Sequence, residues 1–294
     1  MFPHARILGL DLYTIALCLG IVVCFLTFSA LADRRRIPVR VQKLAIISGI
    51  FGIALGYGAA VLTQALYNIK SLGRFEITNS TGATFYGGLL GGAAVFLTIY
   101  FIVGRFYVKE NAHAKCFFDL ATCITPAIAV AHGFGRIGCL CAGCCHGKVT
   151  DAWYGIFMLG DAGYAHYVPV QLFEAVFLLA LFAFLAVRAY RGYGYGLPLY
   201  MSVYGVWRFF IEYIRGDYRG SSLIDFLTPS QLIAAVLVLV GVGVMLLERR
   251  IRANSDAVSE AETAADKDTH MQDGTTAAEE TAKESGDADT EEEK

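Results

Sequence analysis

The sequence predicts an all-α, polytopic membrane protein with about seven transmembrane helices. Of its 294 residues, 56% are hydrophobic and the mean hydropathy is +0.52, which is too apolar for a soluble domain. The apolar residues gather in runs of about 20, the length that an α-helix needs to cross a bilayer. Basic residues follow every second run, as expected for loops that alternate between the two sides of a membrane.

Seven apolar runs define the expected spans. Their approximate bounds are 11–31, 44–66, 84–106, 114–134, 169–188, 196–214 and 229–248. Basic loops follow the first, third, fifth and seventh runs, and positively charged loops stay in the cytoplasm. We therefore expect the N-terminus outside and the C-terminus inside, with Arg136, Arg215, Asp217 and Arg219 near the outer face. Residues 148–168, which are polar and aromatic, are interpreted as an external arm.

The C-terminal part differs in composition from the rest. Residues 253–294 carry 14 acidic and 3 basic side chains and no aromatic residue, whereas residues 1–252 carry 12 acidic and 21 basic side chains. We therefore expect a membrane domain at 1–252 and a disordered acidic cytoplasmic tail at 253–294. The basic charge of the membrane domain suits anionic lipid headgroups and needs no nucleic-acid partner.

The segment 132–147, after the fourth span, is unlike a lipid-facing surface because it combines glycines with an arginine, two histidines and four cysteines. An arginine at the end of an apolar span is costly unless it snorkels or has a partner, so Arg136 is a candidate site residue. His132 precedes it by four residues and therefore shares its helical face.

The cysteines of this segment admit three interpretations. They supply enough ligands for a zinc site, although their spacing is tighter than in paired Cys-x-x-Cys sites. An external position would permit disulfides, and a Cys141–Cys144 bridge would fix the loop that carries Arg136. One cysteine could instead be a reactive thiol. The candidate metal ligands are Cys139, Cys141, Cys144, Cys145 and His146.

Polar residues share one face in the fifth and sixth spans. Gln171 and Glu174 are three residues apart just inside an apolar run, where an unpaired carboxylate is expensive. In the sixth span, spacings of 4, 4 and 3 place four polar residues on one helical face. These are Tyr204, Arg208, Glu212 and Arg215. An internal Arg208–Glu212 pair would account for part of this stripe but not for all of it.

Glycines mark the second and third spans. In the second span their spacing is typical of close helix packing, and the residues are Gly49, Gly52, Gly56 and Gly58. The third span begins with Tyr86, Gly87 and Gly88, where the tyrosine offers a hydroxyl near the outer interface.

These motifs together resemble the bacterial prolipoprotein diacylglyceryl transferases. The resemblance covers about residues 10–248 and rests on FYGGLLG at 85–91, GRIG at 135–138, PVQLFE at 169–174, and YGVWRF at 204–209 continued by Glu212 and Arg215. It implies transfer of the diacylglyceryl group of phosphatidylglycerol to the lipobox cysteine thiol of a preprolipoprotein, with a thioether formed and glycerol phosphate released. The implied location is the bacterial cytoplasmic membrane, the partners are phosphatidylglycerol and the preprolipoprotein signal peptide, and no cofactor is expected.

The resemblance also assigns roles to individual residues. Bidentate guanidinium groups suit a phosphate-ester leaving group, so Arg136, Arg208 and Arg215 would hold the phosphate. A general base must convert the acceptor thiol to a thiolate, and Tyr86 or His132 would take that role. The other substrate-binding residues would be Tyr204, Glu212, Glu174, Gln171, Gly87 and Gly88.

The chain departs from the family pattern at three places, which indicates a divergent, cysteine-rich branch. The usual Asn-Phe-x-Asn-Gly-Glu after the glycine–arginine pair is replaced by CLCAGC at 139–144. Tyr86 and Val168 stand where the family often has histidines. Two other functions therefore stay open: a transferase of the same scaffold with a different acceptor, and a non-catalytic lipid-binding or thiol-redox membrane protein.

Overall fold

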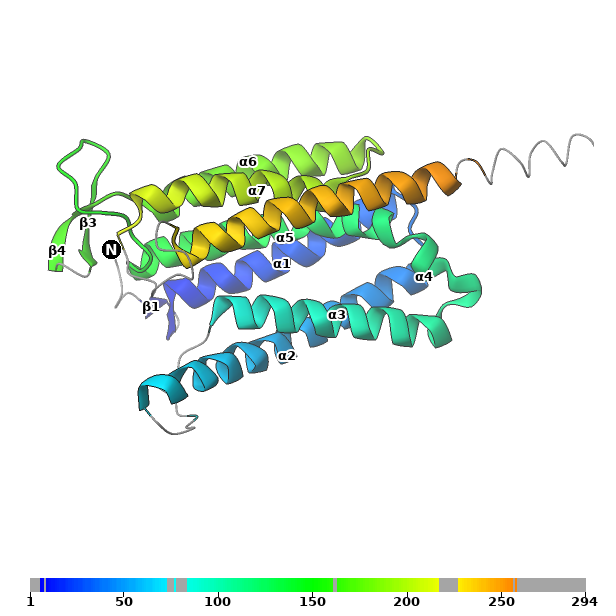
Figure 1. Cartoon of the computed structure of the whole chain (residues 1–294), viewed down its shortest axis with the longest axis horizontal. Helices are drawn as coiled ribbons and strands as arrows, with labels where there is room; N and C mark the ends of the chain where they lie inside the picture. Colours follow the sequence, from blue (N-terminus) through cyan, green and yellow to red (C-terminus); the bar gives the residue numbers. More distant parts are fainter. Residues whose placement is uncertain are drawn as a thin grey trace, which may run out of the picture. The chain divides into compact units, whose positions relative to one another are not determined.

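Long α-helices make up most of the computed structural model (Figure 1). It describes residues 6–7, 9–72, 77, 84–160, 163–216, 227–255 and 257. Asp217, Arg219 and nearly all of the expected tail lie outside these residues. The chain divides into two compact units, Met1–Val242 and Gly243–Lys294, and the contacts described below lie within the first unit.

The main helices follow the predicted spans. They are α1 (Leu12–Arg34), α2 (Val39–Leu72), α3 (Phe85–Tyr107), α5 (Phe117–Ala142), α6 (Val170–Tyr190), α7 (Gly196–Ile211) and a last helix, Pro229–Ser255. Six helices of the described part are long and apolar enough to cross a membrane. The exception is α7, which has 16 residues and continues as the 3-10 helix η2 (Glu212–Ile214). The predicted class, an all-α polytopic membrane protein, is confirmed.

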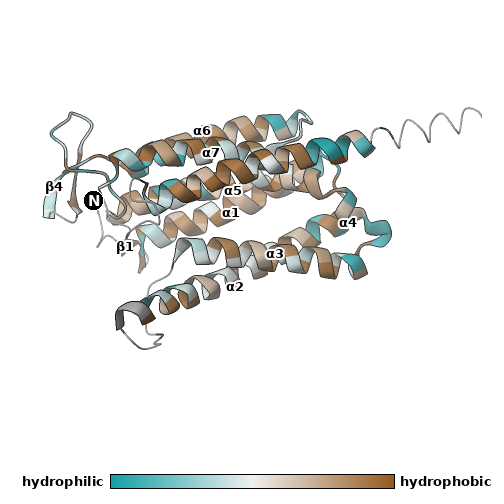
Figure 2. Cartoon of the chain, in the orientation of Figure 1, coloured by the Kyte–Doolittle hydropathy of each residue, from teal (hydrophilic) through white to brown (hydrophobic). Residues whose placement is uncertain are grey.

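Hydrophobic residues predominate along these helices, whereas hydrophilic residues gather in connecting segments such as the one around α4 (Figure 2). That segment consists of the 3-10 helix η1 (Lys109–Asn111) and α4 (Ala112–Lys115). Outward-facing apolar residues are abundant, and Leu90 is 71% exposed. A helix that is apolar on its outer face suits a lipid environment rather than water.

Glycines let α2 and α3 pack closely on each other. A Cβ placed on Gly56 would lie 3.0 Å from the carbonyl oxygen of Gly88 and from the Cα of Gly92, and one on Gly52 would lie 3.1 Å from the oxygen of Gly92. Contacts this short would crowd a side chain against the backbone of α3, so the predicted packing role is confirmed for Gly52 and Gly56. By contrast, a Cβ placed on Gly49 or Gly58 would meet no other described part of the chain within 4 Å, apart from its own stretch of helix.

The helices α1 and α5 run antiparallel. Gly138 near the end of α5 faces Tyr13 near the start of α1, while Arg35, just after α1, pairs with Asp119 in the first turn of α5 at 2.8 Å. Arg35 also donates to the carbonyl oxygens of Ala189, in the last turn of α6, and Tyr193, just after α6, at 3.2 and 3.1 Å. The basic segments after α1 and α6 therefore meet at one end of the helices.

The opposite end is closed by short backbone pairings that position the site. The amide of Gly147 donates to the carbonyl of Val168 at 2.9 Å, and the amide of Lys148 donates to the carbonyl of Ile214 at 3.1 Å. Between these segments, the predicted external arm forms an antiparallel hairpin of β3 (Ile156–Gly160) and β4 (Gly163–Tyr167). A second two-stranded pairing, β1 (Arg6–Ile7) with β2 (Leu10–Asp11), precedes α1. The sequence analysis predicted neither hairpin.

Candidate functional site

A buried carboxylate lies at the centre of the polar residues that α5, α6 and α7 bring together. Glu174, in the second turn of α6, is completely buried. Its Oε1 atom lies 3.1 Å from Nη2 of Arg136, and its Oε2 atom lies 3.8 Å from Nη1 of Arg215. Tyr204 of α7 donates its hydroxyl to the same Oε1 at 2.9 Å. Side chains from three predicted spans therefore converge on one group.

A second carboxylate extends this arrangement along the end of α7. Nη2 of Arg208 lies 2.8 Å from Oε2 of Glu212, and Nε of Arg215 lies 3.8 Å from the same oxygen. Arg215 thus links the two carboxylates. The Thr228 hydroxyl donates to Oε1 of Glu212 at 3.2 Å, which ties η2 to the start of the last helix. The predicted Arg208–Glu212 pair is confirmed, and it belongs to a larger cluster.

The charges of this arginine–glutamate cluster do not balance. In the part of the chain that the structure describes, three guanidinium groups face two carboxylates, which leaves one positive charge among side chains that are mostly buried. Among the described residues, Nε of Arg136 and Nη1 of Arg208 are buried without a hydrogen-bond partner. The short contact from Nη2 of Arg208 to Glu212 is an ion pair by distance, but it lacks hydrogen-bond geometry. Unsatisfied buried donors with a net positive charge are suited to an anion.

Aromatic side chains line the site on the side of His132. The His132 ring packs edge-on against Tyr204 with centroids 4.9 Å apart, and its Nδ1 atom lies 3.0 Å from the hydroxyl of Tyr200. Tyr200 and Tyr204 stack at 5.7 Å. The sequence analysis missed Tyr200, although it lies one helical turn before Tyr204 and continues the same spacing of four. Thr228, which was also missed, has no comparable local signal.

The cysteine-rich loop is attached to the same site. Nε2 of Gln171 donates to the carbonyl oxygen of Cys144 at 2.6 Å. Gly143 has φ of 75°, and the amides of Gly143 and Cys144 bond back to the carbonyls of Leu140 and Cys139, both at 3.2 Å. This pattern is a Schellman motif, the common way in which a helix ends at a glycine. It turns the chain so that Cys144 returns to Cys139.

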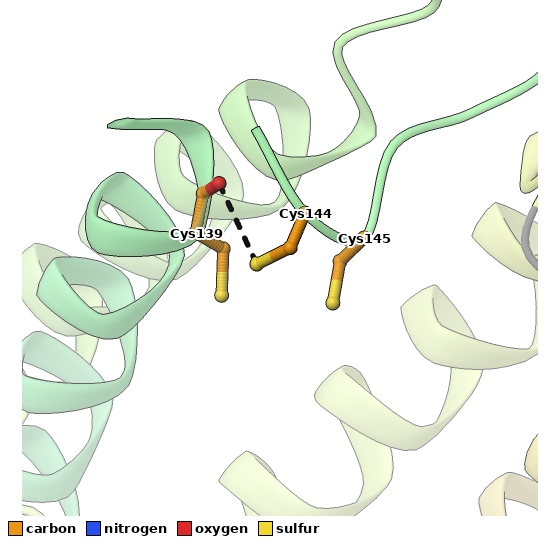
Figure 3. Close-up of side chains that lie close together, drawn as sticks. All are labelled: Cys139, Cys144 and Cys145. Atoms are coloured by element: carbon orange, nitrogen blue, oxygen red, sulfur yellow. Dashed lines mark hydrogen bonds between the residues drawn. The ribbon is translucent and has the colours of Figure 1, made fainter. Parts of the chain in front are cut away.

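Three of the five candidate metal ligands meet in this turn (Figure 3). The Sγ atoms of Cys139, Cys144 and Cys145 all lie within 4.8 Å of one another. Cys141 and His146 are not part of this cysteine cluster; His146 packs instead against the Tyr167 ring, with centroids 4.2 Å apart. The thiols of Cys139 and Cys144, together with the guanidinium groups of Arg215 and Arg136, lower the pKa of the Cys145 thiol.

The remaining predicted site residues lie on a different pair of helices. Tyr86, Gly87 and Gly88 are in the first turn of α3, which packs mainly against α2. Gly87 faces Thr63, and a Cβ on Gly88 would lie 3.2 Å from the Cβ of Ala60. The structure gives these two glycines a packing contact with α2. Their part in substrate binding stays a prediction, as does the catalytic role of Tyr86.

The fold and the cluster define a multi-pass membrane protein with a polar centre buried among its helices. The chain belongs to the prolipoprotein diacylglyceryl transferase family, whose family model matches residues 4–247. The match covers every helix of the described part that contributes to the site, so the family resemblance inferred from the motifs is confirmed.

Relatives with this activity in their names are similar over most of their length. A phosphatidylglycerol–prolipoprotein diacylglyceryl transferase of Clostridium tetani is 33% identical over 215 residues, which are 70% of this chain and 78% of the relative. Phosphatidylglycerol–prolipoprotein diacylglyceryl transferase 2 of Clostridium perfringens is 31% identical over 82% of this chain and 92% of its own. A phosphatidylglycerol–prolipoprotein diacylglyceryl transferase of Ehrlichia ruminantium is 27% identical over 81% of this chain and 92% of the relative.

Proposed function

We propose that this protein transfers the diacylglyceryl group of phosphatidylglycerol to the cysteine thiol of a prolipoprotein. The family supplies the reaction class, and the names of the relatives supply both substrates. The observation that carries the proposal is the net positive charge of the arginine–glutamate cluster, with buried donors on Arg136 and Arg208. A phosphodiester headgroup carries one negative charge and several acceptor oxygens, so it would complement both features.

The arginines have distinct parts in this proposal. Arg136 and Arg208 direct their unsatisfied donors to the phosphate, while Arg215, held between two carboxylates, adds positive charge to the same site. Glu174 and Glu212 orient the guanidinium groups, because each contacts two of them. As the bond to the glyceryl carbon breaks, negative charge grows on the leaving phosphate, and fixed guanidinium groups stabilise it.

The acceptor thiol must lose its proton to become a nucleophile. Of the two predicted bases, His132 has the better support because it packs on Tyr204, which contacts Glu174 directly. Tyr86 begins a helix that packs mainly elsewhere. The acceptor is proposed to be the lipobox cysteine at the end of a signal peptide, which would reach the site from the membrane.

The proposed setting is the bacterial cytoplasmic membrane, with the cysteine-rich end of the helices outside. Its support is the basic character of the other end, where the segments after α1 and α6 meet. The acidic segment 253–294 is proposed to be a cytoplasmic tail without a part in the reaction. The family match ends at residue 247, before this segment begins.

Complementation tests the proposal. The chain is expressed in bacteria depleted of their own diacylglyceryl transferase, and a reporter prolipoprotein is examined by mass spectrometry for the added diacylglyceryl group. We expect a modified reporter with the wild-type chain. Arg208→Ala should lower transfer about 100-fold or more, because each lost charge-assisted hydrogen bond is worth about 1.5–3 kcal/mol.

Two further variants make the result specific. Arg208→Lys keeps the positive charge but loses the planar guanidinium group with its paired donors. Its transfer rate should lie between those of Arg208→Ala and the wild type. Arg191→Ala removes an exposed arginine at the opposite end of the helices and should transfer normally. Full activity of Arg208→Ala would refute the assigned phosphate site. An unmodified reporter with correctly inserted wild-type protein would refute the proposed acceptor.

A further inference from the structure

The cysteine cluster next to the arginines has no part in the reaction proposed above. Cys139 belongs to the last turn of α5, and Cys144 and Cys145 belong to the turn after Gly143. Their three sulfur atoms point toward the same region (Figure 3), and all lie within 4.8 Å of one another. Cys144 is exposed and the other two cysteines are partly buried, so an ion could reach the cluster from solvent.

We propose that Cys139, Cys144 and Cys145 bind one thiophilic divalent cation of the Zn²⁺ type, and that the open fourth position binds the acceptor thiol. The evidence for the metal site is the geometry of the cysteine cluster. The binding of the acceptor thiol rests on the proposed function.

The geometry of the cluster is close to that of a zinc–thiolate site. With Zn–S bonds of about 2.3 Å, the sulfurs of a tetrahedral site lie about 3.8 Å apart, so each pair must approach by about 1 Å or less. Side-chain rotation in a turn can supply this movement while the Schellman motif keeps the backbone in place. Among the described residues, no fourth His, Cys, Asp or Glu joins the group. Three protein ligands with an open position are typical of catalytic rather than structural zinc sites.

The surrounding charges favour such a complex. A divalent cation with three thiolates carries one negative charge, and this rises to two when the acceptor thiolate binds. Arg136 lies three residues before Cys139 and so on the same side of α5, and the backbone of Arg215 pairs with Gly147 just after Cys145. Both arginines interact electrostatically with Cys145. They would offset the negative charge of a metal–thiolate group that is only partly exposed to water.

The metal would activate the nucleophile directly. A thiol that coordinates Zn²⁺ loses its proton, here to water or through water to His132. Its sulfur then forms a bond to the glyceryl carbon as the carbon–oxygen bond to phosphate breaks. The electron pair leaves with the oxygen of glycerol phosphate, and no atom changes its oxidation state. Cys139 follows His132 by two helical turns, about 10 Å along the helix axis, so the proposed proton transfer to the imidazole runs through water.

Metal content provides the first test. Full-length protein is purified, loaded with Zn²⁺, freed of excess metal and analysed by elemental mass spectrometry. We expect about one zinc per chain in the wild type and in Cys141→Ser, a matched control from the same helical turn that lies outside the cluster. Single serine variants of Cys139, Cys144 and Cys145 should each bind zinc at least about tenfold more weakly, because each loses a ligand.

Several results would overturn the metal site. These are a wild-type protein without bound zinc, equal zinc in the cluster variants, and an intact mass that shows two hydrogens lost to a disulfide within the cluster. Because none of these measurements uses transfer activity, they are independent of the proposed function. A zinc-loaded wild type that never modifies a reporter would refute the transferase assignment and leave the metal site standing.

The open position is tested with Co²⁺, whose visible spectrum reports thiolate ligands. A peptide with a single cysteine should increase the thiolate-to-cobalt absorption of the Co²⁺-loaded wild type, whereas the same peptide with serine should not. An unchanged spectrum would overturn the binding of the acceptor thiol at the metal. Metal-free protein that transfers at the wild-type rate would overturn the activating role.

Discussion

Glu174 is the residue on which the contacts of the site depend. Its side chain is fully buried and contacts Arg136, Arg215 and the hydroxyl of Tyr204. A buried carboxylate is tolerated only when charged partners and hydrogen bonds replace the water that it loses. The same contacts hold both arginines in fixed positions, so the carboxylate orders the groups that are proposed to bind phosphate.

Replacing this carboxylate tests that interpretation. Glu174→Gln keeps the shape but removes the charge, which leaves three arginines with one carboxylate. Breaking a buried ion pair in this way costs about 3–5 kcal/mol, so we expect a lower midpoint of thermal unfolding in detergent and about 100-fold slower transfer. Tyr204→Phe is the control because it removes only one hydrogen bond to the same oxygen, worth about 1 kcal/mol. If both variants lowered the unfolding midpoint and the transfer rate equally, the charge of Glu174 would not be what orders the arginines.

Sequence spacing predicted which residues of α7 share a face, because that depends only on the helical period. Tyr204, Arg208 and Glu212 lie in the cluster for this reason. The spacing did not reveal the contact between His132 of α5 and Tyr200 of α7. That contact depends on how two helices pack, and no local pattern encodes it.

At the scale of the element, the end of α5 shows how a local motif assembles a site. Gly143 adopts a left-handed conformation, and the Schellman bonds bring Cys144 back to Cys139. A glycine followed by cysteine, four and five residues after Cys139, is a sequence signal for this turn. The prediction of metal ligands used the spacing of the cysteines and not this turn, so Cys141 and His146 stayed in the candidate set.

The turn can be tested by adding a methyl group. Gly143→Ala forces a residue with a Cβ into the left-handed region, which costs about 1–2 kcal/mol. We expect a lower unfolding midpoint and faster reaction of the cluster thiols with an alkylating reagent. Gly135→Ala is a matched control in the same helix, because its backbone is helical and its new Cβ would meet no described residue beyond its own stretch of helix within 4 Å. Its stability should be unchanged or slightly higher. If Gly143→Ala and Gly135→Ala lowered the unfolding midpoint by similar amounts, the left-handed turn at Gly143 would have no special role.

At the scale of the whole molecule, the distribution of basic residues predicts which side of the membrane holds the site. The structure groups the basic segments at one end and the cysteine-rich loop at the other, and the positive-inside rule turns this grouping into an orientation.

Labelling of intact cells checks the orientation. Trp153, before β3 in the arm predicted to be external, is 95% exposed, and Glu110 in η1 is exposed at the basic end. We expect Trp153→Cys to gain labelling by a membrane-impermeant thiol reagent above the level of the wild type, and Glu110→Cys to gain none until the cells are opened. The reverse pattern would place the site inside the cell and contradict the proposed topology.

The sequence by itself determined the class of fold, the helices that form it and most residues of the cluster. These follow from the length of apolar runs and from the helical period, which are local properties of the chain. The tertiary structure alone decided that Glu174 binds Arg136 and Arg215, that three of the five candidate metal ligands meet, and that Gly87 and Gly88 pack on α2. Each of these depends on contacts between segments distant in the chain or on the direction of a turn, which buried packing and backbone hydrogen bonds determine.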